Sequence, residues 1–259
     1  MSDATAAVRA MSLLRELARA AGPLPAATLS SRLGMPRSST YHLLSAMESE
    51  GFVVHYPEEG RWGLGVSVFE VGAAYTRHEP LEHLGRPLLR ALTHKAAAIA
   101  PVIAHLGVLH GRETMYIARE TTTAPVTAVV DVGVRLPASL TASGRCMLAE
   151  LPPSQVRALF PDRHAFVDRT GRGPTSPTAL RRLLAAEREQ GWSFEEEHVV
   201  EGYASVACAA RDRSGRPAAS VGLTFRTDRV TLSNRQRMAR LCADVARELG
   251  RRLGAPRAA

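Results

Sequence analysis

The chain of 259 residues contains three cysteines, one lysine and no long apolar run. Cys146, Cys208 and Cys242 stand singly, which argues against a disulfide framework and against the paired spacing of a structural zinc site. The sequence contains no run of about 18 apolar residues, so no membrane span is predicted. The first residues carry an acid and lack the apolar segment of a signal peptide. We therefore expect a cytoplasmic protein with reduced thiols.

Arginine is abundant, whereas Lys95 is the only lysine, and the net charge is +8. A basic protein suits a polyanionic partner such as nucleic acid. The excess does not lie at the N-terminus, however, because residues 1–77 hold seven arginines and seven acidic residues. Bulk charge therefore gives only weak support for DNA binding. With 45% apolar residues, the chain is long enough for one large domain or two ordinary ones.

The N-terminal part of the chain has the pattern of a helix–turn–helix. Apolar residues at helical spacing predict an amphipathic helix over residues 5–21. The residues expected on its buried face are Val8, Met11, Leu14, Leu17 and Ala18. A short helix over residues 26–33 ends at Gly34. Glycine takes positive φ at no steric cost, which a tight turn between two helices requires.

The next predicted helix runs from Pro36 to about Glu50 and has the composition of a recognition helix. Its inward residues are expected to be Thr40, Leu43, Leu44 and Met47. A recognition helix needs small or hydrogen-bonding side chains near its start, and Arg, Asn or Gln to reach base edges. The outer residues that meet this need are Arg37, Ser38, Ser39, Tyr41, His42 and Ser45.

A two-stranded wing is predicted after this helix, with strands at residues 52–54 and 61–64 and a turn at residues 57–60. Ser38, Ser39 and the amides of the helix start are placed for phosphates, and Arg37 is the candidate for guanine or a phosphate. Arg61 on the wing would meet the DNA backbone or the minor groove. The alternative, a winged helix that makes only protein contacts, stays open.

The chain changes character after a predicted linker helix at residues 67–77, which Glu79-Pro80 breaks. The predicted domains are a DNA-binding domain at 1–65, a linker at 66–80 and a second domain at 81–255, which the family resemblance described next identifies as an effector-binding and oligomerisation domain. Within the last, helices are predicted at 81–99, 143–151, from 154, at 176–190 and 233–253. Strands are predicted at 102–109, 114–119, 126–130, 204–211 and 218–225. Helices at the ends with antiparallel hairpins between them predict an α+β fold.

Three stretches resemble the IclR family of bacterial transcriptional regulators. The first, similar to its DNA-binding domain, is RAMSLLRELARAAGPLPAATLSSRLGMPRSSTYHLLSAMESEGFV. Two others resemble its effector domain, namely VGVRLPASLTASGRCMLAELP and EQGWSFEEEHVVEGYASVACAARDRSGRPAASVGL. The resemblance implies a winged helix–turn–helix, a linker helix and an effector domain related to GAF folds. It also implies a homodimer or dimer of dimers on operator DNA, and a small organic acid or aromatic metabolite as effector, without a cofactor.

The start of a predicted helix, Thr141-Ala142-Ser143-Gly144, offers free amides and a helix dipole to an anion such as a carboxylate, although an ordinary cap is the alternative. By the resemblance, the effector pocket is lined by Ala128, Leu136, Ala142, Ser143, Glu195, Tyr203, Ser205, Gly222 and Thr224. Many members carry Arg-Cys where this chain has Ala204-Ser205, and often a serine in place of Gly222. These departures, with Tyr203, predict a more apolar or aromatic ligand.

Two other chemistries are weighed against the regulator. Glu195-Glu196-Glu197-His198 could suggest a metal site, but adjacent residues rarely converge on one ion, so we expect an acidic loop with one inward group. Cys146 could serve a thiol hydrolase, but it lies in a predicted helix among apolar residues, without a histidine nearby in sequence. We expect no enzyme. The alternatives are a thiol hydrolase-like sensor enzyme and a ligand-free interaction adaptor.

Overall fold

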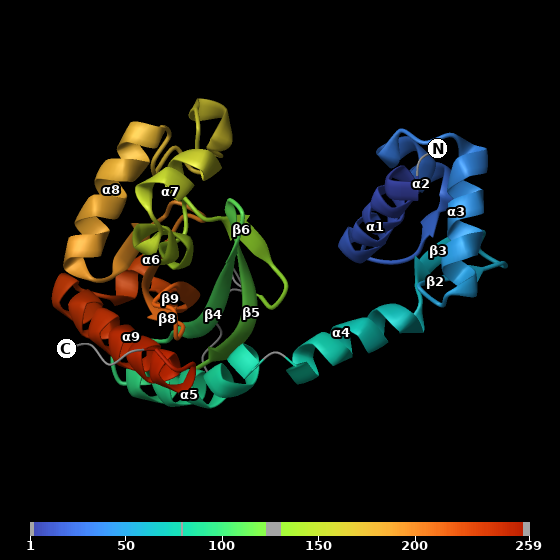
Figure 1. The fold of residues 1–259 in the computed structure, drawn as a ribbon. Coiled ribbons are helices and arrows are strands. Elements are labelled where there is room, and N and C mark those ends of the chain that lie inside the picture. The colour runs from blue at the N-terminus through green and yellow to red at the C-terminus, as the bar shows by residue number, and fades with distance from the viewer. Residues whose placement is uncertain (1–2, 79, 123–130, 256–259) are drawn as a thin grey trace. The chain divides into compact units, whose positions relative to one another are not determined.

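The computed structural model describes residues 3–78, 80–122 and 131–255 (Figure 1). The chain divides into two compact units, residues 1–79 and residues 80–259. Each unit has an apolar core of its own. Within the described residues, no helix is long and apolar enough to cross a membrane.

The N-terminal unit is a winged helix–turn–helix followed by a further helix. Its elements are α1 (Asp3–Arg19), β1 (Leu24–Pro25), α2 (Ala26–Leu33), α3 (Arg37–Ser49), β2 (Val53–Tyr56), β3 (Arg61–Leu64) and α4 (Val66–His78). The strands form an antiparallel sheet in the order β1-β3-β2. The short strand β1 was not predicted, because two residues carry no recognisable alternation, and it owes its conformation to pairing with β3.

The core of this unit lies between α1, α2, α3 and the wing. It includes Leu13, Leu17, Leu29, Leu44, Met47, Val53 and Trp62. The buried face predicted for α1 is wrong in part. Val8 and Met11 are 63% and 56% exposed, whereas Leu13 is fully buried. The helix carries two overlapping apolar stripes, and packing against α2 and β3 selects the stripe through Leu13 and Leu17.

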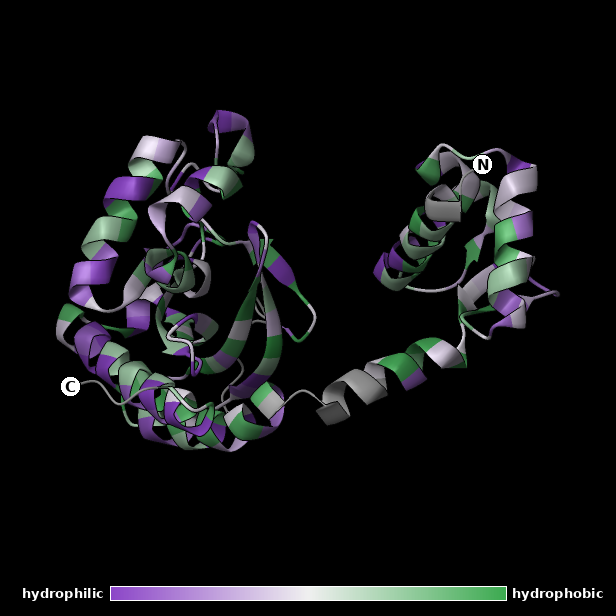
Figure 2. Ribbon diagram, in the orientation of Figure 1, coloured by the Kyte–Doolittle hydropathy of each residue, from purple (hydrophilic) through white to green (hydrophobic). Residues whose placement is uncertain are grey.

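The turn between α2 and α3 forms as expected at Gly34, which has φ 60°. Pro36 is the residue before the helix, with ψ 143°, and not its first helical residue. Its fixed φ suits both positions, so the sequence alone does not distinguish them. In the part of α4 whose side chains are described, residues 66–72, the apolar Val66, Phe69 and Val71 are exposed (apolar green bands on α4 in Figure 2).

The C-terminal unit is α+β, as predicted. Its helices are α5 (Pro80–Ala97), α6 (Ala142–Glu150), α7 (Pro153–Leu159), α8 (Pro177–Gln190) and α9 (Leu232–Arg252). Its strands are β4 (Ile103–His110), β5 (Glu113–Thr121), β6 (Arg135–Pro137), β7 (Ser193–Glu196), β8 (Tyr203–Arg211) and β9 (Pro217–Arg226). They form one sheet in the order β6-β5-β4-β9-β8-β7, and every neighbouring pair is antiparallel.

Helices cover both faces of this sheet (Figure 1). α5 and α9 pack on one face and enclose the main core, which includes Leu89, Leu92, Leu106, Val221 and Phe225. α6 packs on the other face, with α7 and α8 beyond it around Leu148, Phe160, Leu180 and Leu184. This layering places the N-terminal end of α6 over the middle of the sheet, where the candidate effector site lies.

Four details of this unit differ from the predictions, the first being β6, which was not predicted as a strand. The strand expected at residues 126–130 lies outside the described residues. β7 includes Glu195 and Glu196, which were predicted as loop, because acidic residues have low strand propensity and pairing with β8 overrides it. α9 is capped by Thr231, whose Oγ1 accepts the Asn234 N–H at 3.3 Å, and not by Ser233.

Candidate functional site

The outer face of α3 presents the polar side chains identified from the sequence. Arg37, Ser38, Tyr41, His42 and Ser45 are exposed, and Ser39 is half-buried. The opposite stripe holds the helix in place, because Thr40 and Leu44 are fully buried and Met47 is nearly so. The predicted inward and outward faces of this helix are therefore those of the structure.

The start of α3 is open to a ligand. Among the described residues, no side chain caps it, and the first intrahelical bond runs from the Thr40 N–H to the Pro36 carbonyl at 3.0 Å. The amides of residues 37–39 thus have no helical partner and lie at the positive end of the helix dipole. Such an end is a ready site for a phosphate oxygen.

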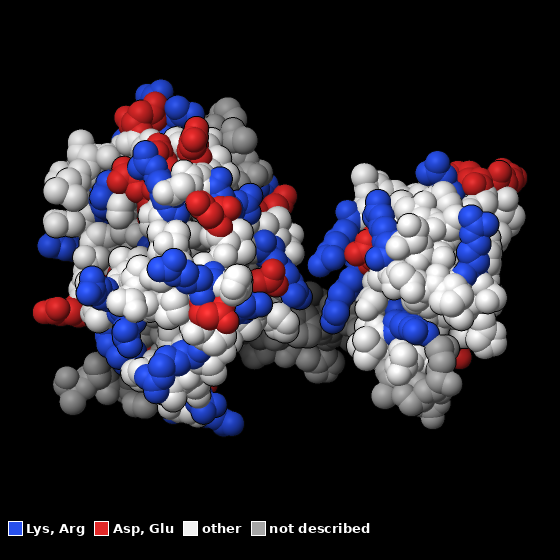
Figure 3. Space-filling model, turned by 90° about the horizontal axis from the view of Figure 1, so that it is seen from above, with Lys and Arg blue, Asp and Glu red and all other residues white. Residues whose placement is uncertain are grey.

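Two arginines outside α3 are further candidates for DNA contact, and one of them lies beside its first turns. A groove of about 320 Å³ beside the first turns of α3 is lined in part by Arg9 of α1, together with Ser38 and His42. The sequence patterns did not identify Arg9, because its position beside α3 follows from helix packing. Arg61 on the wing donates to the Pro23 carbonyl at 3.3 Å and lies 3.9 Å from the Glu59 carboxylate. Figure 3 shows basic side chains scattered over this unit, with acids gathered mainly at one tip.

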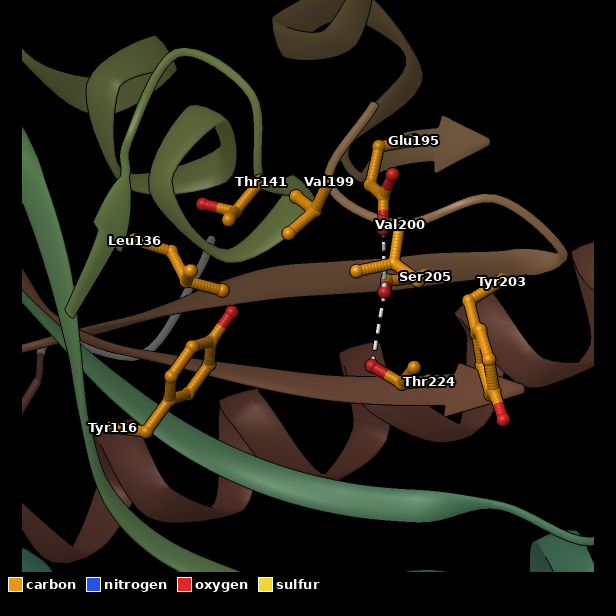
Figure 4. Close-up of a pocket in the computed structure, with 9 residues that line it drawn as sticks. All are labelled: Tyr116, Leu136, Thr141, Glu195, Val199, Val200, Tyr203, Ser205 and Thr224. Atoms are coloured by element: carbon orange, nitrogen blue, oxygen red, sulfur yellow. Dashed lines mark hydrogen bonds between the residues drawn. The ribbon is translucent and has the colours of Figure 1, made fainter. Parts of the chain in front are cut away.

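A small cavity in the C-terminal unit is lined by side chains from β5 to β9, from the segment between β7 and β8, and from the start of α6 (Figure 4). Its lining residues are Tyr116, Leu136, Thr141, Glu195, Val199, Val200, Tyr203, Ser205 and Thr224. Five of the nine predicted effector residues are among them, namely Leu136, Glu195, Tyr203, Ser205 and Thr224. The volume of about 10 Å³ holds about one water molecule, so a metabolite requires side chains to move.

The other predicted effector residues do not line this cavity. Ala128 lies outside the described residues. Ala142 is fully buried against Met147 and Ala207. Ser143 is 1% exposed, and its Oγ lies 3.4 Å from Nδ1 of His105. A Cβ atom on Gly222 would lie 2.2 Å from Cε1 of His105, so His105 occupies the space that a serine there would need.

A buried chain of hydrogen bonds runs from the cavity into the sheet (Figure 4). Ser205 donates to Oε1 of Glu195 at 2.8 Å, and the Ser205 and Thr224 hydroxyls are 2.9 Å apart. His105 Nε2 lies 3.0 Å from the Thr224 hydroxyl. Burial lowers the pKa of His105 to about 3, so the imidazole is neutral at this end of the chain. The sequence showed His105 only as one histidine in an apolar strand, which is a weak signal.

The carboxyl group of Glu195 is the acidic end of this chain of hydrogen bonds. Burial raises its pKa to about 7, although the hydrogen bond from Ser205 and the charge of Arg145 lower it. Its other oxygen accepts the His198 N–H at 3.1 Å. None of the described lining residues is cationic. Near neutral pH this carboxyl therefore exists in both protonation states and can accept or donate a hydrogen bond.

Arg145 holds the strand that carries Glu195. This fully buried guanidinium donates from Nε to the Glu187 carboxylate at 3.0 Å and from Nη1 to the Leu140 carbonyl at 3.0 Å. Nη2 donates to the Phe194 carbonyl of β7. One cation thus joins α6, α8 and β7 and satisfies the buried Glu187. The sequence patterns did not identify this pair, because its members are 42 residues apart.

The start of α6 is an ordinary cap. Thr141 Oγ1 accepts the Gly144 N–H at 3.0 Å and lies 3.2 Å from the Thr114 hydroxyl. Gly144 itself is packed so closely that an added Cβ would lie 2.3 Å from Cα of Ala138. The Gly144 amide, which we predicted could bind an anion, therefore already donates to Thr141. The Thr141 side chain also lines the cavity.

The residues weighed for metal and thiol chemistry, the acidic run at 195–198 and Cys146, do not come together in the described part of the chain. There, no group of three or more His, Cys, Asp or Glu could hold a metal ion. Glu195 faces the cavity, whereas Glu196 pairs with Arg235 at 3.5 Å, so the acidic run diverges. Cys146 is 5% exposed and burial raises its pKa, so its sulfur is a protonated thiol and no nucleophile.

Comparison with known proteins links both units to one family. The profile described as "Bacterial transcriptional regulator IclR C-terminal" matches residues 73–251, and that of the "IclR helix-turn-helix domain" matches residues 6–57. The chain is 30% identical over 253 residues to the glycerol operon regulatory protein of Streptomyces coelicolor, covering 96% of each. Both profiles agree with the order of the two units described above.

Solved structures share the fold. A crystal structure of an IclR-type regulator from Silicibacter sp. TM1040 matches with a TM-score of 0.83 and 21% identity, covering 97% of both chains. An IclR homologue from Microbacterium hydrocarbonoxydans, solved with 4-hydroxybenzoate, matches with a TM-score of 0.79 and 18% identity, covering 96% of this chain and 98% of that one.

Proposed function

The chain belongs to the IclR family of bacterial transcriptional regulators, and from this premise we propose that a small hydroxylated aromatic or organic acid in the Glu195 cavity controls its operator affinity. The protein is a DNA-binding transcriptional regulator with a C-terminal effector domain. The observation that carries the proposal is the pairing of an open, polar helix face in one unit with a buried, polar-lined cavity in the other.

We assign operator contacts to the outer face of α3 and to the wing. Arg37 reads a guanine or holds a phosphate, and Ser38 and Ser39 bind phosphate together with the uncapped amides of residues 37–39. Tyr41, His42 and Ser45 face the major groove, and Arg61 meets the backbone or the minor groove. Because residues 1–77 are neutral in sum, one such unit binds DNA weakly, and affinity requires two units in a homodimer or dimer of dimers.

The effector class follows from the lining of the cavity. Glu195 can accept a hydrogen bond from a ligand hydroxyl, or donate one to a ligand carboxylate once it is protonated. The Thr141 and Ser205 hydroxyls add polar partners, and Leu136 and Val199 pack against an apolar ring. A hydroxylated aromatic acid meets all three demands, and the relative solved with 4-hydroxybenzoate is in keeping with this class. Charged acids of two or three carbons leave the apolar side uncovered.

Ligand binding requires the cavity to enlarge, because about 10 Å³ accommodates no metabolite. Val199 and Val200 lie in the segment between β7 and β8, which contains the positive-φ residues Glu197 and Gly202. Movement of this segment changes the state of the effector unit. An altered oligomer geometry then changes the spacing of the two α3 helices. The protein acts in the cytoplasm, where operator DNA lies, and performs no catalysis.

The test is footprinting of the promoter beside the gene, with full-length protein and a panel of hydroxybenzoates, benzoate and pyruvate. We expect a footprint, and we expect a hydroxybenzoate to shift the protein concentration of half-maximal protection at least about fivefold. This shift corresponds to a coupling free energy of about 1 kcal/mol between effector binding and DNA binding. Ser205→Ala should keep the footprint and lose the shift. A footprint that no ligand moves would contradict the effector proposal and leave DNA binding standing.

Oligomerisation has a separate test. The fragment 1–79 contains the complete winged helix–turn–helix and its core, so it can be compared with the full-length chain on the same operator. We expect the fragment to bind at least about tenfold more weakly. Without the C-terminal unit it is not joined to a second copy, so only one winged helix–turn–helix contacts the phosphates at a time. Equal affinity would show that the C-terminal unit adds nothing to DNA binding, whereas a ligand-free adaptor would give no footprint with either protein.

A further inference from the structure

A second and larger hollow lies in the C-terminal unit, away from Glu195. It is a groove of about 680 Å³ between α9 on one side and α6 with the end of α8 on the other. β7 pairs with β8 only from Ala204 to Ala207. The remainder of β8, through Arg211, reaches the groove beyond the end of β7. The helices on the two faces of the sheet therefore form its walls.

Small apolar residues make up much of the walls of the groove. Ala149 of α6, Ala209 of β8 and Ala243 and Ala246 of α9 line it. Their methyl groups leave room where larger side chains would close the gap. Trp192, which follows α8, lines one end and is half-buried, with its ring held edge-on to Phe194 at 6.4 Å between centroids. Trp192 thus contributes an aromatic side chain to the lining of the groove, where a ligand ring can pack.

The rim of the groove is basic. Arg188, Arg211, Arg247 and Arg251 line it. Of the two acids in the lining, Glu187 is bound by the buried Arg145, and Glu150 pairs with Arg211 at 2.6 Å.

Two of the rim arginines, Arg247 and Arg251, keep donors for a ligand, whereas Arg188 donates from Nε and Nη2 to the Ala149 and Leu151 carbonyls. Arg251 pairs with Glu248 at 2.8 Å, and Arg247 pairs with Asp244. Neither Glu248 nor Asp244 lines the groove. A guanidinium has five N–H donors, and one carboxylate partner leaves several of them available. The described lining therefore carries more positive than negative charge, which favours an anion.

We propose that this groove is a second ligand site, which binds an aromatic carboxylate with its ring against Trp192 and the alanines and its carboxylate on the rim arginines. The volume lies in the range of about 300–1,000 Å³ that small-molecule sites occupy. Arginine binds carboxylates through two parallel hydrogen bonds. The Glu195 cavity differs in size and in charge, since it is near 10 Å³ and has no cation in its described lining.

The site is tested by calorimetric titration of the full-length protein with 2-naphthoate, together with quenching of Trp192 fluorescence. The double variant Arg247→Gln/Arg251→Gln removes two rim charges and should weaken 2-naphthoate about fivefold, because its carboxylate then loses two cationic partners. The matched control is Arg237→Gln/Arg240→Gln, which changes two exposed arginines of α9 outside the groove and should leave the affinity unchanged. Neutral 2-naphthamide should bind more weakly than 2-naphthoate.

Ser205→Ala distinguishes this site from the Glu195 cavity, because Ser205 lines that cavity and not the groove. The variant should leave 2-naphthoate binding at the groove unchanged. The proposal fails if the wild-type protein does not bind 2-naphthoate, or if Arg247→Gln/Arg251→Gln binds it as tightly as wild type. It also fails if this variant instead lowers the molecular mass in light scattering, because the groove would then be a contact between copies of the chain. None of these results bears on the footprinting test of the Glu195 cavity.

Discussion

The two units build their candidate sites in opposite ways. In the N-terminal unit, six polar residues on nine consecutive positions of α3 form an almost wholly exposed face. In the C-terminal unit, the cavity is assembled from residues between Tyr116 and Thr224, and most of them are buried. An exposed face can change without loss of stability. A buried polar site is part of the core, so its binding chemistry and the stability of the fold are coupled.

The coupling arises because the buried polar groups satisfy one another. Glu195, Ser205, Thr224 and His105 form one hydrogen-bonded chain, and Arg145 holds β7 beside it. Removing one member leaves another without a partner in a medium of low polarity, which costs more than the bond itself contributes. The α3 face has water available to replace any lost partner. The following substitutions test this contrast, in order of their expected effect on stability.

The largest effect is expected for Arg145→Met. The variant leaves the buried Glu187 carboxylate without its cation and frees the Leu140 and Phe194 carbonyls. Breaking a buried ion pair on one side costs about 3–5 kcal/mol of unfolding free energy. Urea unfolding measures this loss, with Arg181→Met on the exposed side of α8 as the control. A loss below about 1 kcal/mol would show that the pair is not structural.

The pH dependence of stability should depend on Glu195. Folding raises its pKa from 4.5 to about 7, so the native state holds the proton more tightly and becomes less stable as pH rises through this window. Neutral His105 has the opposite effect. Folding lowers its pKa to about 3, so the native state loses stability as pH drops below the ordinary pKa of a histidine. The difference between wild type and Glu195→Gln isolates the carboxyl.

From about pH 5 to about pH 8 we expect the wild type to lose roughly 2–3 kcal/mol of unfolding free energy relative to Glu195→Gln. Urea unfolding at both pH values measures the difference. Parallel curves for the two proteins would mean that the carboxyl is solvated in the native state and that its environment resembles the exposed face of α3.

A smaller loss is expected for Gly222→Ser. The serine Cβ would lie 2.2 Å from Cε1 of His105, so either strand β9 or the imidazole must shift. Overpacking of this kind costs about 1–3 kcal/mol, measured as a lower midpoint in urea. Gly22→Ser, in the other unit, has nothing within 4 Å of the added Cβ and serves as control. If both variants unfold at the wild-type midpoint, the sheet around His105 is more adaptable than its packing indicates.

The smallest effect on stability is expected for Arg37→Ala. The side chain is exposed, so the unfolding free energy should stay within about 0.5 kcal/mol of wild type. Operator affinity, measured by fluorescence anisotropy, should fall by about 1–3 kcal/mol if Arg37 contacts a base. Arg181→Ala provides a control for the loss of one positive charge. Unchanged operator affinity would remove Arg37 from the proposed contacts.

The accuracy of the sequence-based predictions differs between the units for a physical reason. The inward and outward faces of α3 follow from helical periodicity, so residues 37–45 were sorted correctly. The face of α1 was misjudged because the helix carries two apolar stripes and only packing chooses between them. In the effector unit, β7 was predicted as a loop, because its pairing with β8 overrides the low strand propensity of acidic residues.

The sequence by itself determined the winged helix–turn–helix, the α+β class of the C-terminal unit and the membership of one family, because these rest on local periodicity, turn residues and contiguous motifs. Only the tertiary structure decided how the effector unit uses its polar residues. It paired Arg145 with Glu187, set His105 against Gly222 and joined Glu195 to Thr224 through Ser205. Such contacts join residues far apart in the chain, and burial then sets their charge, which no local pattern encodes.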